Sequence, residues 1–372
     1  MTRIRPFTIQ VPDDVLADLD RRLAHARLLP DSPRKPWSGL SADYLTDLVG
    51  SWRELDWRDR ERWLNAHPQF LAGIDGAEVH FVHLRSDRPD APALLVMHGW
   101  PHTFALQLEF ADLLPDFDVV VPSLPGFGFS SAYADGEMSE TRVAATMHAL
   151  MTEVLGYDRY LTYGEDVSAN VNDLLASSHP DAVLGIVATH AHFPSGPERE
   201  ALTDAAEVAF FARIAADHGT HGGYGHIQAT RPDTLAVGLN DSPAGLLAWL
   251  VEKIVEWSDT PEDDPRQVEV RISRERLLTE ATIYWVTQSI GSSFRPYYEG
   301  ADQPAEIPPT VVPAAVFIQR HERDYPESLA REFYRDLRVF ERLAEGGHFT
   351  VAEVPAAMAE RTRAFARGIG AL

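Results

Sequence analysis

The stretch that most restricts how this chain can fold is DRYLTYGEDVSANVNDLLASS, at 158–178. An extended apolar run leads into a turn with small residues at Gly164 and Ser168, and a helical run follows. A strand, a sharp turn and a helix in this order raise the central side chain above a sheet, as in the pattern G-x-S-x-G. Here Asp166 stands where that pattern has serine. By itself it could cap the helix, or it could attack a substrate.

Extended apolar runs recur along the chain at 93–97, 118–123, 158–164, 182–190, 311–319 and near 337–343. Helical patterns separate most of them. This alternation predicts an α/β fold with a mostly parallel sheet and helices on both faces. An Asp75-Gly76 pair inside the extended segment 70–86 predicts a hairpin ahead of these strands.

Two segments lie outside this alternation. Residues 1–70 show helical spacing and contain Trp37, Trp52, Trp57 and Trp63, so we expect a helical meander that packs on the core. Residues 198–302 are helical and rich in loops, which predicts an insertion. The expected division is therefore a meander at 1–70, a first part of the core at 71–197, a cap at 198–302 and a second part of the core at 303–372.

The charge and composition of the 372 residues exclude several classes of protein. A formal net charge of −23 argues against binding to nucleic acid or to an anionic membrane. The absence of cysteine excludes disulfides and thiolate metal sites. We find neither a signal peptide nor a stretch of about 18 apolar residues. A cytoplasmic protein, monomeric or homodimeric, is therefore expected.

Three further motifs follow predicted strands. MHGWP, at 97–101, provides the N–H of Trp100, which together with the N–H of Val167 could form an oxyanion hole. HERD, at 321–324, offers Glu322 or Asp324 as an acid, and EGGHF, at 345–349, contains His348. The resulting order of nucleophile, acid and histidine is that of α/β-hydrolases.

Taken together, these motifs resemble the epoxide hydrolases of the microsomal type. The likeness extends over nearly the whole chain, from RPFTIQVPDDVLADLDRRL at 5–23 through HGWP to two cap segments. The cap segments are GYGHIQATRPDTLAVGLNDSP at 223–243 and YWVTQSIGSSFRPYY at 284–298. The resemblance implies an α/β-hydrolase fold with a helical cap and an amino-terminal meander. The chain shows no counterpart of the membrane anchor of the microsomal animal enzymes and is similar to their soluble bacterial relatives, so we expect a protein of that kind.

The resemblance also implies roles for individual residues. It identifies Asp166 as the nucleophile, His348 as the base and Glu322 as the acid partner, with Asp324 as the alternative. Two cap tyrosines are implied, Tyr224 and Tyr297, with Tyr298 as the alternative to Tyr297. The chain departs from the family at Val167, where tryptophan is common, and at Ser168, where glycine is usual.

The expected reaction converts an epoxide and water into a vicinal diol through an ester of Asp166. It requires no metal and no organic cofactor. Two alternatives remain open at this point. A haloalkane dehalogenase would share the aspartate, histidine and acid, and Trp100 stands where a halide donor often lies. A non-catalytic binding protein could use the same scaffold, although it should have lost at least one of these groups.

Overall fold

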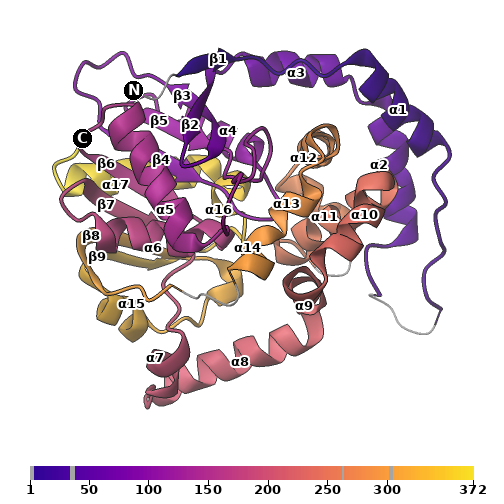
Figure 1. The fold of residues 1–372 in the computed structure, drawn as a ribbon. Helices are drawn as coiled ribbons and strands as arrows, with labels where there is room; N and C mark the ends of the chain where they lie inside the picture. Colours follow the sequence, from indigo (N-terminus) through magenta and orange to yellow (C-terminus); the bar gives the residue numbers. More distant parts are fainter. Residues whose placement is uncertain (1–3, 34–37, 262–263, 301–304) are drawn as a thin grey trace.

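The computed structural model describes residues 4–33, 38–261, 264–300 and 305–372. A nine-stranded sheet forms its centre, with the strand order β1-β2-β3-β5-β4-β6-β7-β8-β9 (Figure 1). The strands are β1 (Arg5–Phe7), β2 (Gln69–Ile74), β3 (Ala77–Leu84), β4 (Ala93–Met97), β5 (Asp118–Pro122), β6 (Tyr160–Gly164), β7 (Val183–Ala188), β8 (Thr310–Ile318) and β9 (Tyr334–Arg342).

The sheet is antiparallel at one end and parallel through the rest. β1, β2, β3 and β5 pair antiparallel in that order, and every pair from β5 across to β9 is parallel. The predicted hairpin joins β2 to β3, and its turn residues Asp75 and Gly76 have φ of 47° and 78°. The predicted mostly parallel sheet of an α/β-hydrolase is confirmed.

Helices cover both faces of the sheet, as expected for a parallel sheet whose strands are buried on both sides. All five residues of β4, β5 and β6 are buried. The helices around the sheet are α4 (Phe104–Asp112), α5 (Glu140–Ala149, extended by a π turn at Leu150–Val154), α6 (Ala169–Ser178), α15 (Glu327–Phe333), α16 (Thr350–Glu353) and α17 (Pro355–Gly368).

The segment between β7 and β8, called here the cap after the predicted insertion, contains helices and no strand among its described residues. These helices stand beside the sheet in Figure 1, shaded from pink to orange. They are α7 (Gly196–Glu200), α8 (Ala205–His221), α9 (Gly223–Thr230), α10 (Pro232–Asp241), α11 (Pro243–Trp257), α12 (Arg274–Thr287), α13 (Ile290–Ser293) and α14 (Arg295–Glu299). The predicted boundary between 302 and 303 lies outside the described residues.

The amino-terminal segment contains α1 (Asp13–Ala24), α2 (Ala42–Glu54) and α3 (Trp57–Asn65). The segment was expected to be helical throughout, but Arg5–Phe7 forms β1, which pairs with β2 and is the edge strand of the sheet. Its helices α1 and α2 pack on the cap helix α11, and the indole N–H of Trp52 donates to the hydroxyl of Thr282 on α12 at 2.8 Å. The segment therefore contacts the cap as well as the core. Trp37 lies outside the described residues.

No helix in the described part of the chain is both long and apolar enough to cross a membrane. The cytoplasmic location and the oligomeric state remain predictions.

Candidate active site

The turn after β6 holds Asp166 in an unusual backbone conformation. Its φ is 52°, a region that non-glycine residues rarely adopt and that often marks a functional position. Two small residues make the turn possible. A Cβ on Gly164 would lie 2.4 Å from the carbonyl oxygen of Ser168, and the Ser168 hydroxyl lies 3.0 Å from the Glu165 N–H and 3.2 Å from the carbonyl oxygen of Met97. The Ser168 hydroxyl therefore links the elbow to Met97, the last residue of β4, by a hydrogen bond.

The loop after β4 lies directly against this elbow. The N–H of Trp100 donates to Oδ1 of Asp166 at 2.7 Å. A Cβ on Gly99 would lie only 2.4 Å from the Cβ of Asp166, so this contact requires a glycine. The loop 98–102, called here the oxyanion loop, therefore brings one of the two expected N–H donors to the aspartate.

His348, in the loop after β9, reaches the other carboxylate oxygen. Its Nε2 lies 3.1 Å from Oδ2 of Asp166. Burial alone would raise the pKa of Asp166, but the hydrogen bonds from His348 and Trp100 outweigh burial and lower it to about 2. Burial opposes a charge on His348, yet contact with Asp166 raises its pKa above the usual value. The aspartate is therefore an anion at neutral pH.

The two candidate acids occupy different surroundings. Asp324 is exposed and forms an ion pair with Arg213 of the cap helix α8, with Nε 2.8 Å from Oδ2. Glu322 is half-buried, with its carboxyl group enclosed near His348. Burial of the carboxyl raises the pKa of Glu322 to about 7, and the charge of His348 opposes this rise. Among the described residues, Oε2 of Glu322 has no hydrogen-bond partner, and no hydrogen bond joins Glu322 to His348. Of the two, only Glu322 lies beside the histidine.

A residue that the sequence analysis missed contacts His348. Nε2 of His190 lies 3.0 Å from Nδ1 of His348, and the rings meet edge to face. Burial, then the neighbouring His348, lower the pKa of His190 well below its usual value, so His190 is neutral. Its position two residues after β7, at the same edge of the sheet as the elbow, was the signal that could have identified it.

The cap contributes the two tyrosines that the sequence motifs predicted to be together. The ring of Tyr224, on α9, stacks on Trp100 with centroids 5.4 Å apart, and Tyr297, on α14, meets the same indole edge-on at 6.1 Å. Burial is the main reason that the pKa of each phenol is raised, and the charge of Asp166 adds to it. Both hydroxyls therefore remain protonated and lie within the field of Asp166.

The neighbouring tyrosine points elsewhere. Tyr298 is 54% exposed, whereas Tyr297 packs among Trp100 and Tyr224. Further rings line the site, since Trp257 and Phe294 also contact Trp100. The side chains gathered around Trp100, whose N–H contacts Asp166, are therefore mainly aromatic.

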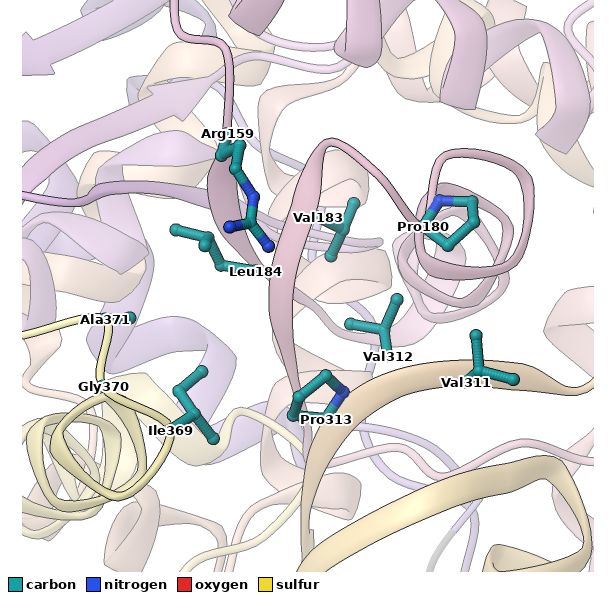
Figure 2. Close-up of a pocket in the computed structure, with 10 residues that line it drawn as sticks. All are labelled: Arg159, Pro180, Val183, Leu184, Val311, Val312, Pro313, Ile369, Gly370 and Ala371. Carbon is teal, nitrogen blue, oxygen red and sulfur yellow. The ribbon is translucent and has the colours of Figure 1, made fainter.

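A separate pocket of about 260 Å³ lies away from this cluster (Figure 2). It is lined by the beginnings of β7 and β8 and by residues 369–371, whereas Asp166, His190 and Glu322 follow the ends of their strands. Arg159 is its one ionisable side chain. The pocket holds no pair of groups for nucleophilic or acid–base chemistry.

The arrangement at Asp166 is suited to a particular chemistry. A carboxylate anion lies near enough to two protonated phenols to raise their pKa values, and an imidazole contacts it. Attack by a carboxylate on a strained carbon produces an ester, and a phenol can protonate the departing oxygen. Within the described residues no group of three or more potential ligands could hold a metal ion.

Comparisons with known proteins show which proteins this chain is similar to. The model of the epoxide hydrolase N terminus matches residues 4–107, and that of the alpha/beta hydrolase fold matches residues 92–222. A protein of Stigmatella aurantiaca with the name "Putative epoxide hydrolase" is 35% identical over 97% of this chain and 84% of its own length. Epoxide hydrolase 1 of the rabbit, Oryctolagus cuniculus, is 30% identical over 96% of this chain and 87% of its own.

Solved structures show the same likeness. The juvenile hormone epoxide hydrolase of the silkworm Bombyx mori superposes with a TM-score of 0.85 at 28% identity, over 99% of this chain and 94% of that one. The epoxide hydrolase of Aspergillus niger superposes with a TM-score of 0.83 at 30% identity, over 99% and 97%.

Proposed function

The chain belongs to the epoxide hydrolase family with an α/β-hydrolase fold, and from this premise we propose that it converts epoxides into vicinal diols through an ester of Asp166. The observation that carries the proposal is the position of Asp166, whose carboxylate lies between the N–H of Trp100, the imidazole of His348 and two cap tyrosines.

The first step is attack of Oδ2 or Oδ1 of Asp166 on an epoxide carbon. The low pKa of the carboxyl keeps it ionised, and a carboxylate attacks carbon from the side opposite the leaving oxygen. Tyr224 and Tyr297 hydrogen-bond the epoxide oxygen, and one of them gives it a proton as the carbon–oxygen bond breaks. Because their raised pKa values keep both phenols protonated, each is available as the acid.

The second step is hydrolysis of the ester. His348, once neutral, removes a proton from water, and the resulting hydroxide attacks the ester carbonyl of Asp166. The tetrahedral intermediate then breaks the bond to the diol oxygen, which takes the proton of the new Asp166 carboxyl and leaves as the diol. The imidazolium of His348 returns its proton to the tyrosinate, so that each group regains its starting state. The N–H groups of Trp100 and Val167 stabilise the oxyanion, and a donor of this kind contributes about 3–4 kcal/mol in comparable enzymes. Glu322 supplies the negative charge that stabilises the imidazolium, and its burial beside His348 supports this role over Asp324.

The rings around Asp166 also indicate the kind of substrate. Trp100, Trp257, Phe294 and the rings of the two tyrosines offer apolar faces, and none of them carries a charge at neutral pH. An apolar epoxide with an aryl or bulky alkyl group fits this lining better than a charged one. A haloalkane dehalogenase would direct N–H donors to a halide, whereas the groups directed to Asp166 from the cap are phenols.

Heavy-oxygen labelling tests the ester mechanism. In a single turnover in H₂¹⁸O, with enzyme in excess over styrene oxide, the diol should carry unlabelled oxygen and the peptide that contains Asp166 should gain the label. A labelled diol with an unlabelled peptide would mean that water attacks the epoxide directly. In the His348→Gln variant the intact protein should gain the mass of the epoxide, because the ester forms but is not hydrolysed.

A further inference from the structure

A second carboxylate lies directly beside the candidate nucleophile, and the proposed mechanism does not use it. Glu165 precedes Asp166 in the elbow and is completely buried. Its backbone is extended, with φ −137° and ψ 155°, whereas that of Asp166 is left-handed. The side chain of Glu165 does not point to the cap, because its partners all come from the core.

Three side chains hold this carboxylate in place. Nε2 of His102 and Nε2 of Gln107 each lie 2.7 Å from its Oε1, and the hydroxyl of Tyr163 donates to its Oε2. Each of these side chains is at most 1% exposed. A buried carboxylate is stabilised when hydrogen bonds of this kind replace its lost hydration.

The contact with His102 joins the two halves of the expected oxyanion hole. His102 follows Trp100 by two residues, and Glu165 precedes Val167 by two. Nε2 of His102 also lies 3.3 Å from the backbone nitrogen of Gly99, so the ring contacts the oxyanion loop itself. The ring of His102 also meets the ring of Phe349 edge-on at 5.2 Å, next to His348. The buried pair of Glu165 and His102 therefore joins the elbow to the oxyanion loop and contacts Phe349, the residue after His348.

The oxyanion loop and the elbow are in close contact at Asp166. The N–H of Trp100 lies 2.7 Å from Oδ1, and Gly99 is already so close that an added Cβ would collide with the aspartate. A small retreat of the oxyanion loop would therefore separate the N–H of Trp100 from the N–H of Val167. In an oxyanion hole the donors must sit within about 0.5 Å of their working positions.

We propose that Glu165 and His102 are positioning residues whose hydrogen bond sets the spacing of the oxyanion hole, so that they act on ester hydrolysis more than on epoxide opening. The inference rests on the proposed function. Charge develops between the two N–H groups only when water attacks the ester, whereas the carboxylate is already an anion before it attacks the epoxide. Loss of the pair therefore weakens the second step selectively.

Glu165 has a second effect, through charge. Several titratable groups face His348: Asp166 in the elbow, His190 after β7, and His321 and Glu322 after β8. Burial opposes a charge on His348, and the negative charge of Glu165 is one of the causes that raise the pKa of His348. His348 must be neutral to accept a proton from water. Removal of the charge at Glu165 should therefore lower the pH at which ester hydrolysis becomes fast.

The test compares Glu165→Gln, His102→Phe and their double variant with a matched control. The control is Asp173→Asn, on α6, because Asp173 is equally buried and contacts His192 at 3.2 Å and Tyr334 at 2.8 Å, away from the oxyanion loop. Rapid quenching with intact mass detection gives the rates of ester formation and ester hydrolysis for styrene oxide. Each rate is measured from pH 5.5 to 9.

In each single variant, ester hydrolysis should be roughly tenfold slower, and ester formation should change by less than about twofold. The expected loss is smaller than the loss of at least about 10²-fold that follows when an oxyanion donor is removed outright. The double variant should lose no more than the slower single variant, because both changes remove the same hydrogen bond. The pH midpoint of hydrolysis should move down in Glu165→Gln and stay in place in Asp173→Asn.

Wild-type rates of hydrolysis in both single variants would overturn the inference, as would an equal slowing in Asp173→Asn. If Glu165→Gln does not fold, His102→Phe provides the same comparison. Failure of both variants to fold would also overturn the inference, because the pair would then be needed for folding and not for the spacing of the oxyanion hole. The proposed function fails separately, by the absence of any ester in the wild-type enzyme.

Discussion

Replacement of Glu322 by glutamine should stabilise the protein at alkaline pH while it slows ester hydrolysis. The carboxyl group of Glu322 is buried, and its Oε2 has no hydrogen-bond partner among the described residues. Burial raises its pKa from the ordinary 4.5 to about 7. A carboxyl with a raised pKa binds its proton more tightly in the folded state than in the unfolded state. Its contribution to stability is therefore present at low pH and is lost as the pH rises from about 4.5 to about 7.

The magnitude follows from the two pKa values. At about 1.4 kcal/mol per pH unit, the shift corresponds to a penalty of about 3 kcal/mol once the pH exceeds the folded value. At pH 5 the same calculation gives less than about 1 kcal/mol. Glutamine has nearly the same shape and no ionisation, so Glu322→Gln should gain about 2–3 kcal/mol over wild type between pH 5 and pH 8.5.

Urea unfolding, followed by tryptophan fluorescence at pH 5, 7 and 8.5, measures this difference. Asp324→Asn is the matched control, because Asp324 is two residues away and exposed, and its pH dependence should follow wild type within about 0.5 kcal/mol. Parallel pH profiles of Glu322→Gln and wild type would refute the reasoning, since they would mean that the carboxyl ionises as easily in the folded protein as in the unfolded one.

Three further predictions concern the reaction itself. Gly99→Ala should form the ester at least about 10²-fold more slowly, because the added Cβ would lie 2.4 Å from the Cβ of Asp166. Rapid-quench kinetics equal to those of the wild type would contradict the close contact. Tyr224→Phe and Tyr297→Phe should each slow ester formation in part and together nearly abolish it, whereas Tyr298→Phe, at an exposed position, should remain at the wild-type rate. A double variant that forms the ester at the wild-type rate would exclude the phenols as acids. The rate of ester hydrolysis should rise with pH through the pKa of His348, which lies above the usual histidine value; a profile flat from pH 5.5 to 9 would mean that His348 is not the base.

Much of the framework was predictable because local patterns carry it. Apolar runs bounded by turn residues placed β4 at 93–97 and the hairpin turn at Asp75-Gly76, since strand formation depends on residues that are neighbours in the chain. The order of the motifs likewise placed Asp166 and His348 after parallel strands, whose ends meet at one edge of the sheet. Their 3.1 Å contact follows from that topology.

The tertiary structure decided which of two nearby residues enters the site. Tyr297 and Tyr298 are adjacent on α14, and neighbours on a helix point about 100° apart, so packing of α14 against α9 directs one ring to Trp100 and leaves the other in solvent. Likewise, the turn after β8 buries Glu322, while Asp324 pairs with Arg213 of the cap.

The contacts between the polar groups that surround Asp166 also depended on the three-dimensional structure. His190 meets His348 across 158 residues of chain, and Glu165 meets His102 across 63. Periodicity in a sequence reveals which face of an element is buried but not which side chain lies opposite. The sequence therefore determined the sheet, the elbow and the chemical types at the site, and only packing of the loops against one another determined which buried polar groups pair.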